Sequence, residues 1–420
     1  MHCTEVVVTG VGIVSPIGIG REAFWRSLCE GHSGVGIIQR FDPAGLPLRL
    51  AAEVRDFYAK RYVAQRKQLK VMCRDAQLGV AAAGLACRDA GLEPSKIDQN
   101  RFGVVLGADR ICTPLDDSEP TYRACLVDGR FDFGRWWAEG AAASFPLSFL
   151  RVLPNMIASH VSIAHDARGP NNTIHQAEAS GLLAVAEAAS VIRRGAADVM
   201  LAGGASSQLD PFDCVRHCAV GGLSSRQDDP AAAMRPFDAD RDGQVYGEGA
   251  AMFILELRSH AEARGAAILA RVLAAASACD ATNGSSSSSL RRAMQLALTQ
   301  AGVSAAQLGH VNAHGLSTRE DDVIEAQAIH AIAPEAPVTA PKSYFGNLGA
   351  AAGAMEMAVS VLAFGAGLAP PTLNYWRPDP RCPIEVIRGE PMRLSDRAPS
   401  ALLLNRTAAG QAVAVVLAGP

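Results

Sequence analysis

The chain has 420 residues, 49% of them hydrophobic and 19% charged, which fits a soluble globular protein built as one large α/β unit or two fused ones. Its formal net charge of -3, without a run of six like charges, argues against binding to nucleic acid. The N-terminus enters a β-branched run without a basic segment, and no window approaches the ~18 consecutive apolar residues of a membrane span. We therefore expect a cytoplasmic protein.

The ten cysteines are scattered along the chain and form no close pairs of the kind that bind zinc or build a disulfide framework. Most of them are expected to be small buried hydrophobic residues. The sequence therefore predicts no metal centre, and we expect no other cofactor.

Short apolar runs alternate along the chain with longer Ala-rich stretches. The apolar runs predict strands at residues 6–8, 104–106, 199–201, 252–255 and 414–417. Apolar residues at i, i+3 and i+4 spacing predict helices at residues 75–90, 180–194, 290–301 and 321–332. This rhythm is typical of buried sheets that helices cover.

Two polar segments interrupt this pattern. Residues 113–137 carry acidic and aromatic side chains and predict an irregular insertion that covers an interface or a cavity. The serine run within residues 280–289 predicts a mobile loop before a helix. Strands, helices and Gly-rich turns follow one another in similar order before and after Leu257, which is typical of a duplicated α/β unit. We place the two lobes at residues 1–256 and 257–420.

Residues 169–181 read GPNNTIHQAEASG, a β-rich run that enters an Ala-rich helix, with Glu178 just before the helix. Such strand-to-helix elbows often hold the nucleophile of an α/β enzyme. His175 and Gln176 are assigned to the strand before Glu178, as packing or interface residues. Three further histidines are interpreted as surface or loop residues: His160, His165 and His217.

Five segments in order carry a family resemblance across essentially the whole chain: VVVTGVGIVSPIG, GPNNTIHQAEASG, MRPFDADRDGQVYGEGA, NAHGLSTREDD and PKSYFGNLGAAAGAMEM. Together they resemble the β-ketoacyl synthase family of the thiolase superfamily. The resemblance implies an α/β subunit with a thiolase-like, five-layered αβαβα fold built from two duplicated lobes. It also implies dimerisation through the central sheets and work on acyl chains that phosphopantetheine links to acyl carrier protein.

In active members of that family, a cysteine at the elbow accepts the acyl group, and two histidines decarboxylate a malonyl thioester and stabilise the carbanion. A thiolate at a helix N-terminus suits the first step, and imidazoles that donate to an enolate oxygen suit the second. By resemblance, Glu178 stands at the cysteine position, His314 at the first histidine and Asn347 at the second, whereas Lys342 is retained. An acyl-glutamate would be a hydrolysable anhydride, so ordinary condensation is not expected.

Substrate-binding positions of the family also differ. The pattern HGTxT reads HGLST, so Leu316 replaces a hydroxyl that meets the pantetheine arm, while Thr318 is kept. The C-terminal gate NSFGFGG reads NRTAAGQ, with Thr407 and Ala409 in place of two phenylalanines and Gly410 kept. In active relatives this loop controls access and supplies a donor to the oxyanion hole. Two acidic residues near the site are retained: Asp322 and Glu325.

These changes favour a subunit similar to a chain length factor, which keeps the fold, lacks the nucleophile and pairs with an active ketosynthase in polyketide, polyene or fatty-acid elongation. The assembly would be a heterodimer, with a homodimer as the alternative. In this interpretation Glu178 is structural, held by the dipole of its helix, with His314 or Lys342 as candidate charge partners.

Three alternatives stay open. A malonyl-carrier-protein decarboxylase would need Glu178 protonated, so that the carboxyl resembles the glutamine amide of loading-module ketosynthases, and it would have one imidazole instead of two. A repurposed enzyme would use Glu178 as a general base, with His314 and Lys342 as electrostatic partners. A non-catalytic scaffold would bind acyl carrier protein or lipid without a ketosynthase partner.

Overall fold

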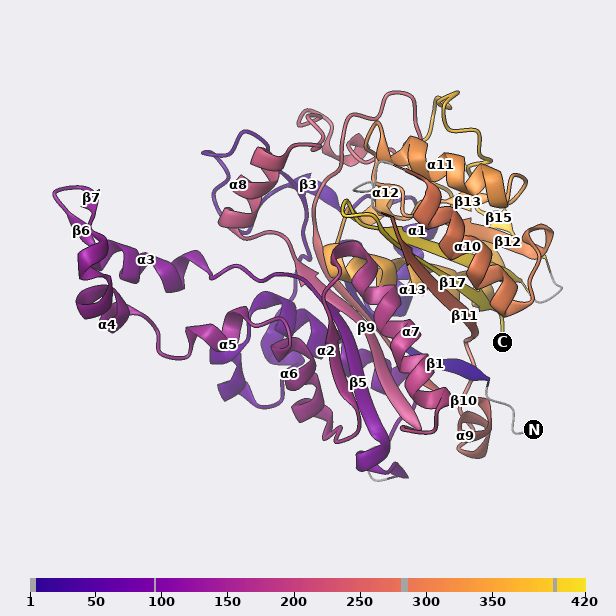
Figure 1. The fold of residues 1–420 in the computed structure, drawn as a ribbon, viewed down its shortest axis with the longest axis horizontal. Coiled ribbons are helices and arrows are strands. Elements are labelled where there is room, and N and C mark those ends of the chain that lie inside the picture. The colour runs from indigo at the N-terminus through magenta and orange to yellow at the C-terminus, as the bar shows by residue number, and fades with distance from the viewer. Residues whose placement is uncertain (1–4, 94–95, 281–285, 396–398) are drawn as a thin grey trace.

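The structure is a computed structural model that describes residues 5–93, 96–280, 286–395 and 399–420. Its centre is a large mixed sheet to which both halves of the chain contribute (Figure 1). The strands of the first half are β1 (Val6–Ser15), β5 (Phe102–Ala108), β8 (Asn171–Ile174), β9 (Val199–Ser207) and β10 (Glu248–Leu257). The strands of the second half are β11 (Ala270–Cys279), β12 (Leu308–Asn312), β13 (Val338–Thr339), β16 (Ser400–Arg406) and β17 (Gln411–Ala418).

The two halves of the sheet repeat one topology. The strand order is β8-β5-β9-β10-β1 in the first half and β13-β12-β16-β17-β11 in the second. In each half the first three strands are parallel and the remaining pairs are antiparallel. Val6–Val8 of β1 pair with Ala270–Val272 of β11 and join the halves. The duplication expected from the sequence is therefore present, while the lobe boundary between residues 256 and 257 stays a prediction.

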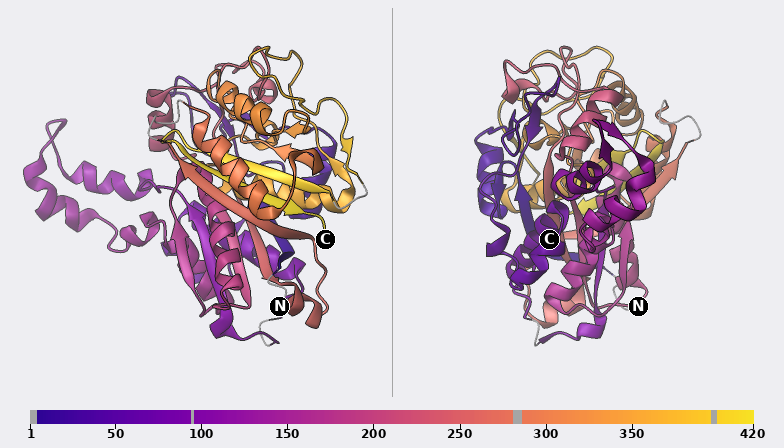
Figure 2. Two further views of the ribbon diagram at one scale, coloured as in Figure 1. Left: turned by 45° about the vertical axis from the view of Figure 1, so that its right-hand side comes forward. Right: turned by 90° about the vertical axis from the view of Figure 1, so that its left-hand side faces the viewer.

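Helices form three layers around the two half-sheets (Figures 1 and 2). The outer face of the first half is covered by α2 (Arg74–Asp89) and α6 (Met156–His165). The outer face of the second half is covered by α10 (Ser288–Ala301) and α11 (Asp321–Ile332). Between the halves lie α7 (Ser180–Arg193) and α13 (Ala352–Ala366). The five-layered αβαβα order implied by the family resemblance is thus confirmed.

The side-chain alternation along the strands explains these layers. In β10, Phe253 packs in the core that contains α7 and α13, while its neighbours Met252 and Ile254 pack in the core that contains α2. Because successive side chains point to opposite faces, a continuous apolar run can serve helices on both sides. Gly12 of β1 permits the close approach of α2, since a Cβ there would lie 1.9 Å from the carbonyl oxygen of Ala82.

The strands and helices predicted from periodicity are all present, and the predicted helices α2, α7, α10 and α11 agree within two residues at each end. One described stretch, Gly349–Ala366, is long and apolar enough to cross a membrane by composition, yet 83% of it is buried inside the protein. It contains the core helix α13 between the half-sheets. Within the predicted serine loop, residues 281–285 lie outside the described residues.

Shorter elements connect this framework. They are β2 (Gly18–Ile19), α1 (Arg21–Cys29), β3 (Val35–Ile37), β4 (Leu50–Ala52), α8 (Pro211–Val220), α9 (Arg258–Ala263), α12 (Lys342–Phe345), β14 (Leu368–Ala369) and β15 (Met392–Arg393). Of these, α8 and α12 carry residues of the candidate site.

Residues 111–155, here called the arm, project from the body at the left of Figure 1. The arm contains α3 (Leu115–Ala124), β6 (Leu126–Val127), β7 (Arg130–Phe131), α4 (Ala141–Ala143) and α5 (Ser148–Val152). Four rings, of Tyr122, Phe131, Phe133 and Trp136, lie in contact near its tip, with centroids 5.8 to 6.5 Å apart. The insertion predicted at residues 113–137 is therefore part of a longer segment, and it is partly helical where the sequence suggested irregular structure.

Candidate functional site

The elbow that carries Glu178 is a strained turn between β8 and α7. The strand ends at Ile174, and Ala177, with a positive φ of 42°, is the first residue of a short 3-10 turn that leads into α7. A left-handed conformation is costly for a residue with a Cβ, so it is typical of functional turns. His175 and Gln176 follow the strand instead of belonging to it, and both are exposed. The assignment of these two residues to the strand was therefore wrong by two positions.

The side-chain amides of Asn347 and Gln244 form a hydrogen-bonded chain that holds the carboxyl group of Glu178. Asn347, which follows α12, donates from Nδ2 to Oε1 of Glu178 at 3.1 Å and to Oε1 of Gln244 at 2.8 Å. The Asn347 Oδ1 accepts from the backbone N–H of Gly349 at 3.1 Å. An amide nitrogen carries only two hydrogens, so both donors of Asn347 are occupied. Among the described residues, the side-chain hydrogen-bond partner of Glu178 is therefore Asn347, while Lys342, one of the two candidate charge partners, acts on Glu178 through its charge.

Burial raises the pKa of Glu178 above its ordinary value, and the nearby charge of Asp109 raises it further. The Asn347 hydrogen bond and the positive charge of Lys342 act in the opposite direction without reversing the shift. Asp109 is itself buried, and burial likewise raises its pKa. The surroundings of Glu178 therefore favour its neutral form, which can donate a hydrogen bond.

A second buried network holds His314 beside this amide chain. Lys342 Nζ lies 3.0 Å from His314 Nδ1 and 2.7 Å from the His314 carbonyl oxygen, and it forms an ion pair with Glu356. Glu325 accepts from the backbone N–H groups of His314 and Gly315 at 2.7 and 2.8 Å. An ammonium can only donate, so Nδ1 accepts and the imidazole proton resides on Nε2. Burial, aided by the Lys342 charge, lowers the His314 pKa well below its ordinary value.

The Nε2 atom of His314 is buried and has no hydrogen-bond partner among the described residues. A buried N–H without an acceptor is unfavourable, and such groups often serve a bound molecule. The neutral His314 ring therefore keeps a donor that could stabilise an enolate or carbonyl oxygen at this site. Asn347, at the second histidine position, has no such donor left.

Two acidic residues of α11, Asp321 and Asp322, hold neighbouring loops. Thr318 Oγ1 donates to Asp321 Oδ2 at 2.8 Å, and Asp322 Oδ2 accepts from the backbone N–H of Phe237 at 2.8 Å. Leu316 is half-buried. The Asp322 side chain thus fixes the loop that contains Phe237.

The gate residues form a tight turn between β16 and β17. The backbone N–H of Thr407 donates to the Gln411 carbonyl at 2.8 Å, and that of Gly410 donates to the Thr407 carbonyl at 3.0 Å. Gly410 has a positive φ of 89°, which suits a glycine. Thr407 is buried and Ala409 is exposed, so this turn presents small side chains where active relatives have phenylalanines. No aromatic side chain of the turn is available to close the site.

A cavity of about 310 Å³ opens beside Glu178. Its walls include Asp109, Arg110, Arg216, His217 and Tyr246, which the sequence did not suggest as site residues. His217 is only 5% exposed and stacks on Tyr246 with ring centroids 3.6 Å apart. Burial lowers the pKa of His217 to about 4, so its ring is neutral.

Two of the three histidines assigned to the surface are therefore buried, namely His160 and His217. Hydrophobic periodicity does not predict the burial of these two histidines, because a histidine on a short helix fits a buried or an exposed position. Gln244 and Tyr246 belong to the segment MRPFDADRDGQVYGEGA, which carries the family resemblance, so the motif itself was the available signal. Among the described residues, no group of three or more His, Cys, Asp or Glu side chains is arranged to hold a metal ion.

The duplicated αβαβα fold, with a strained elbow before α7 and a buried histidine after β12, defines a protein of the thiolase type. The family model described as "Beta-ketoacyl synthase, N-terminal domain" matches residues 4–261, and that described as "Beta-ketoacyl synthase, C-terminal domain" matches residues 269–376. The chain belongs to the β-ketoacyl synthase family.

Similar curated proteins include 3-oxoacyl-[acyl-carrier-protein] synthase 2 of Vibrio cholerae, 35% identical with 92% of each chain covered. The tetracenomycin polyketide synthase ketoacyl synthase alpha subunit of Streptomyces glaucescens is 34% identical over 99% of this chain and 97% of its own. Among solved structures, the ishigamide ketosynthase/chain length factor has a TM-score of 0.88 at 29% identity, with 99% of each chain covered. A type II polyketide synthase acyl carrier protein in complex with its ketosynthase has a TM-score of 0.81 at 29% identity, again with 99% of each chain covered.

Proposed function

We propose that this chain is a ketosynthase-like subunit without its own condensing nucleophile, which pairs with an active ketosynthase during acyl-chain elongation on acyl carrier protein. The observation that carries the proposal is the hydrogen bond from Asn347 to Glu178. The two positions that hold a thiol and an imidazole in active relatives hold a carboxyl and an amide that bind each other. Neither the buried carboxyl of Glu178 nor the amide of Asn347 attacks a thioester as a thiolate does.

The surface beside the site supports a partner of similar fold. β8 is the last strand of its half-sheet and pairs only with β5, so its other edge is open among the described residues. An open strand edge is a ready template for pairing. Large apolar side chains are exposed on the arm and on α8 next to the elbow, among them Phe133 at 75%, Trp137 at 86% and Val220 at 77%. Apolar exposure of this kind marks interaction surfaces.

A basic strip supports an acidic carrier protein as the second partner. Residues 55–74 contain seven basic residues and one acidic residue, although the whole chain has a net charge of -3. Lys60, Arg61, Arg66, Lys67 and Lys70 are exposed, and none of them forms a salt bridge within the described part of the chain. Such a concentration of positive charge favours encounter with a negatively charged protein.

The experiment that tests the proposal is co-expression with an intact ketosynthase encoded in a neighbouring gene, followed by purification on a tag carried by this chain alone. We expect recovery of both chains in equal amounts. Trp137→Asp should reduce recovery of the partner, because it places a charge on the exposed arm, whereas Leu296→Asp on the outer helix α10 should leave recovery unchanged. A stable homodimer that ignores the ketosynthase would favour a repurposed enzyme or a scaffold instead.

One observation favours malonyl-carrier-protein decarboxylation as a second candidate function. Burial raises the pKa of Glu178, which favours the neutral carboxyl that this activity requires, and His314 Nε2 is an unpaired donor. Against it, both donors of Asn347 are already engaged, so an enolate would receive one hydrogen bond instead of two. An assay for acetyl-carrier protein formed from malonyl-carrier protein tests this activity, and turnover at background excludes it.

A further inference from the structure

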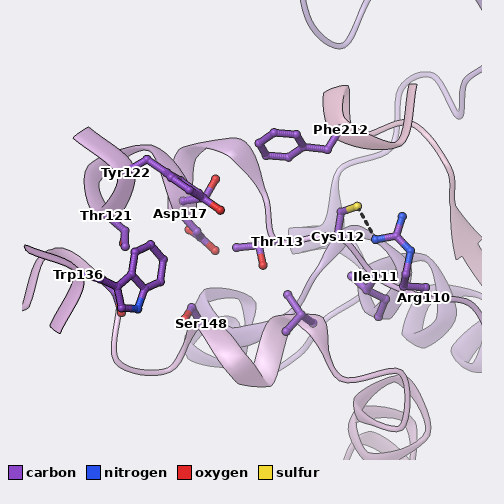
Figure 3. A pocket seen from close by; sticks show the side chains of 13 residues that line it. Arg110, Ile111, Cys112, Thr113, Asp117, Thr121, Tyr122, Trp136, Ser148 and Phe212 are labelled. Atoms are coloured by element: carbon purple, nitrogen blue, oxygen red, sulfur yellow. Dashed lines mark hydrogen bonds between the residues drawn. The ribbon is translucent and has the colours of Figure 1, made fainter. Parts of the chain in front are cut away.

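A groove at the end of the core helix α13 is separate from the cavity beside Glu178. The groove has a volume of about 360 Å³, and it is lined by α1, by the segment before β11 and by the C-terminal turns of α13. It shares no lining residue with the cavity of about 310 Å³ beside Glu178. Nor does it share one with a cavity of about 630 Å³ that is lined mainly by the arm and is shown in Figure 3. The groove is therefore a distinct site.

The two ends of α13 lie at different places in the molecule. Its first residue, Ala352, follows the loop that binds Asn347, and its last residue, Ala366, lines the groove. The 15 residues of α13 span about 22 Å, because an α-helix rises about 1.5 Å per residue. A small molecule bound in the groove is thus remote from Glu178.

The walls of the groove are mainly apolar. Trp25 of α1, Leu269 before β11 and Leu362 of α13 line it, and all three side chains also pack against the core between the half-sheets. Gly365 leaves space in the lining, since a Cβ there would have no heavy atom within 4 Å. A cavity of this size with apolar walls and a few polar groups is typical of sites that bind small organic molecules.

The two charged residues of the lining differ in their partners. Arg21 Nη1 forms a salt bridge with Asp89 Oδ1 at 2.9 Å, whereas Glu22 is exposed and forms no ion pair with another described residue. Arg26, four residues farther along α1, does not line the groove and is not paired with Glu22. The carboxylate of Glu22 is therefore the charge in this lining that lacks a counter-ion among the described residues.

The position of Glu22 next to an aromatic ring indicates the class of ligand. Glu22 and Trp25 are three residues apart on α1, so their side chains are neighbours on one face of the helix. A carboxylate and an indole ring both attract a cation, the first by its charge and the second by the negative face of the ring. We propose that the groove binds a small organic cation, with an ammonium group at Glu22 and a flat apolar body against Trp25. This activity goes beyond the proposed function, because it requires neither a ketosynthase partner nor a carrier protein.

The test compares three probes that share an indole body, on the full-length chain and by calorimetry. Tryptamine carries an ammonium group, tryptophol carries a hydroxyl group and indole-3-propionate carries a carboxylate. We expect tryptamine to bind about threefold to tenfold more tightly than tryptophol, as an exposed cation–π contact and a charged hydrogen bond would give. Indole-3-propionate should bind most weakly, because its charge repels that of Glu22.

Glu22→Gln should bring the ratio of the tryptamine and tryptophol dissociation constants close to one, since it removes the charge and keeps the size of the side chain. Glu335→Gln is the matched control, because Glu335 is exposed, lies outside the groove and forms no ion pair with another described residue. It changes the net charge by the same amount and should leave the ratio unchanged. Because a ratio compares two probes on one protein, a modest loss of stability in a variant does not affect it.

Gly365→Leu tests whether the probes bind in the groove. The leucine side chain would fill the space that Gly365 leaves open, so it should weaken the binding of both tryptamine and tryptophol by about tenfold or more. Gly45→Leu is the control, since a Cβ at Gly45 also has no heavy atom within 4 Å and Gly45 lies outside the groove. It should leave the binding of both probes unchanged.

Four outcomes would overturn the inference. They are absence of tryptamine binding at millimolar concentration, tryptophol or indole-3-propionate binding as tightly as tryptamine, an unchanged ratio in Glu22→Gln, and unchanged binding in Gly365→Leu. None of them bears on the proposed function, because co-purification with a ketosynthase uses no indole probe.

Discussion

Asn347 and Glu178 are 169 positions apart in the chain, and their side chains are joined by a hydrogen bond of 3.1 Å at the centre of the site. The bond connects the elbow before α7 to the segment after α12, and through Gln244 it reaches the loop before β10. Under the proposed function, this hydrogen-bonded carboxyl and amide stand where active relatives hold a reactive pair. The predictions below follow from this replacement and from the buried groups around it.

The isolated chain should form no β-ketoacyl product from acyl- and malonyl-loaded carrier protein. Glu178→Cys should not restore condensation, because Asn347 still lacks a free donor and the gate still lacks its phenylalanines. Product is measured by mass spectrometry of the carrier protein, with an intact ketosynthase as the positive control. Robust product from the single variant would show that the amide and the altered gate do not limit the chemistry.

Stability should depend on pH through Glu178. Its folded-state pKa lies above the ordinary value of 4.5, so above that pH the unfolded chain loses the proton first and the folded state loses stability as pH rises through the folded-state pKa. Glu178→Gln keeps an acceptor for Asn347 and removes the titration. Its gain in free energy of unfolding over wild type should therefore grow as pH rises above the ordinary value of 4.5 and level off above the folded-state pKa, as measured by urea unfolding.

Glu187→Gln is the control for this measurement, since Glu187 lies farther along α7 and pairs with Arg194 at the surface. It shows how much of the change in the profile comes from removing another carboxyl, one that lies on α7. A Glu178→Gln profile that runs parallel to that of wild type would mean that Glu178 is ionised in the folded state throughout this range.

Breaking the buried ion pair of Lys342 and Glu356 should be costly. Lys342→Met removes the counter-charge of Glu356, whose pKa burial already raises to about 7, and removing one partner of a buried pair costs about 3 to 5 kcal/mol. Lys96→Met, which removes an exposed pair with Glu93, should change stability by less than about 1 kcal/mol. Chemical denaturation compares the two variants. A loss for Lys342→Met as small as that of the control would contradict the buried ion pair.

Gly349 should tolerate no side chain. Its φ is +52°, and a Cβ would lie 2.1 Å from Asp109 Oδ2, which accepts from the backbone N–H of Ala350 at 2.6 Å. Gly349→Ala should lower the melting temperature and disturb the loop that holds Asn347. Gly365→Ala lies near the end of the core helix α13, where a Cβ would face open space, and should be neutral or stabilising by up to about 1 kcal/mol. Similar melting temperatures for the two variants would argue against the tight turn.

Hydrophobic periodicity was sufficient for the framework, because a run such as Met252–Leu255 fits only a strand buried on both faces. Periodicity could not indicate that Asn347 would meet Glu178, since that contact depends on how two distant loops are placed by the sheet. Nor could it reveal the positive φ of Ala177 or the burial of His217, which follow from tertiary packing. The family motifs indicated which positions form the site, and the fold showed which residues contact one another there.

The duplicated topology brings the N-terminal ends of α7 and α13 to the same point, where a Cβ on Gly181 would lie 2.9 Å from the Ala350 carbonyl oxygen. The partial positive charge of two helix dipoles at this point comes from the backbone, so side-chain replacement does not remove it. If Glu178 has replaced a thiol, as the proposed function holds, the exchange removes one reaction and leaves in place an electrostatic field that favours developing negative charge. The reactivity of the side chain and the electrostatic field of the backbone are therefore separable properties of this fold. A change of side chain can remove or restore the reactivity, while the field persists.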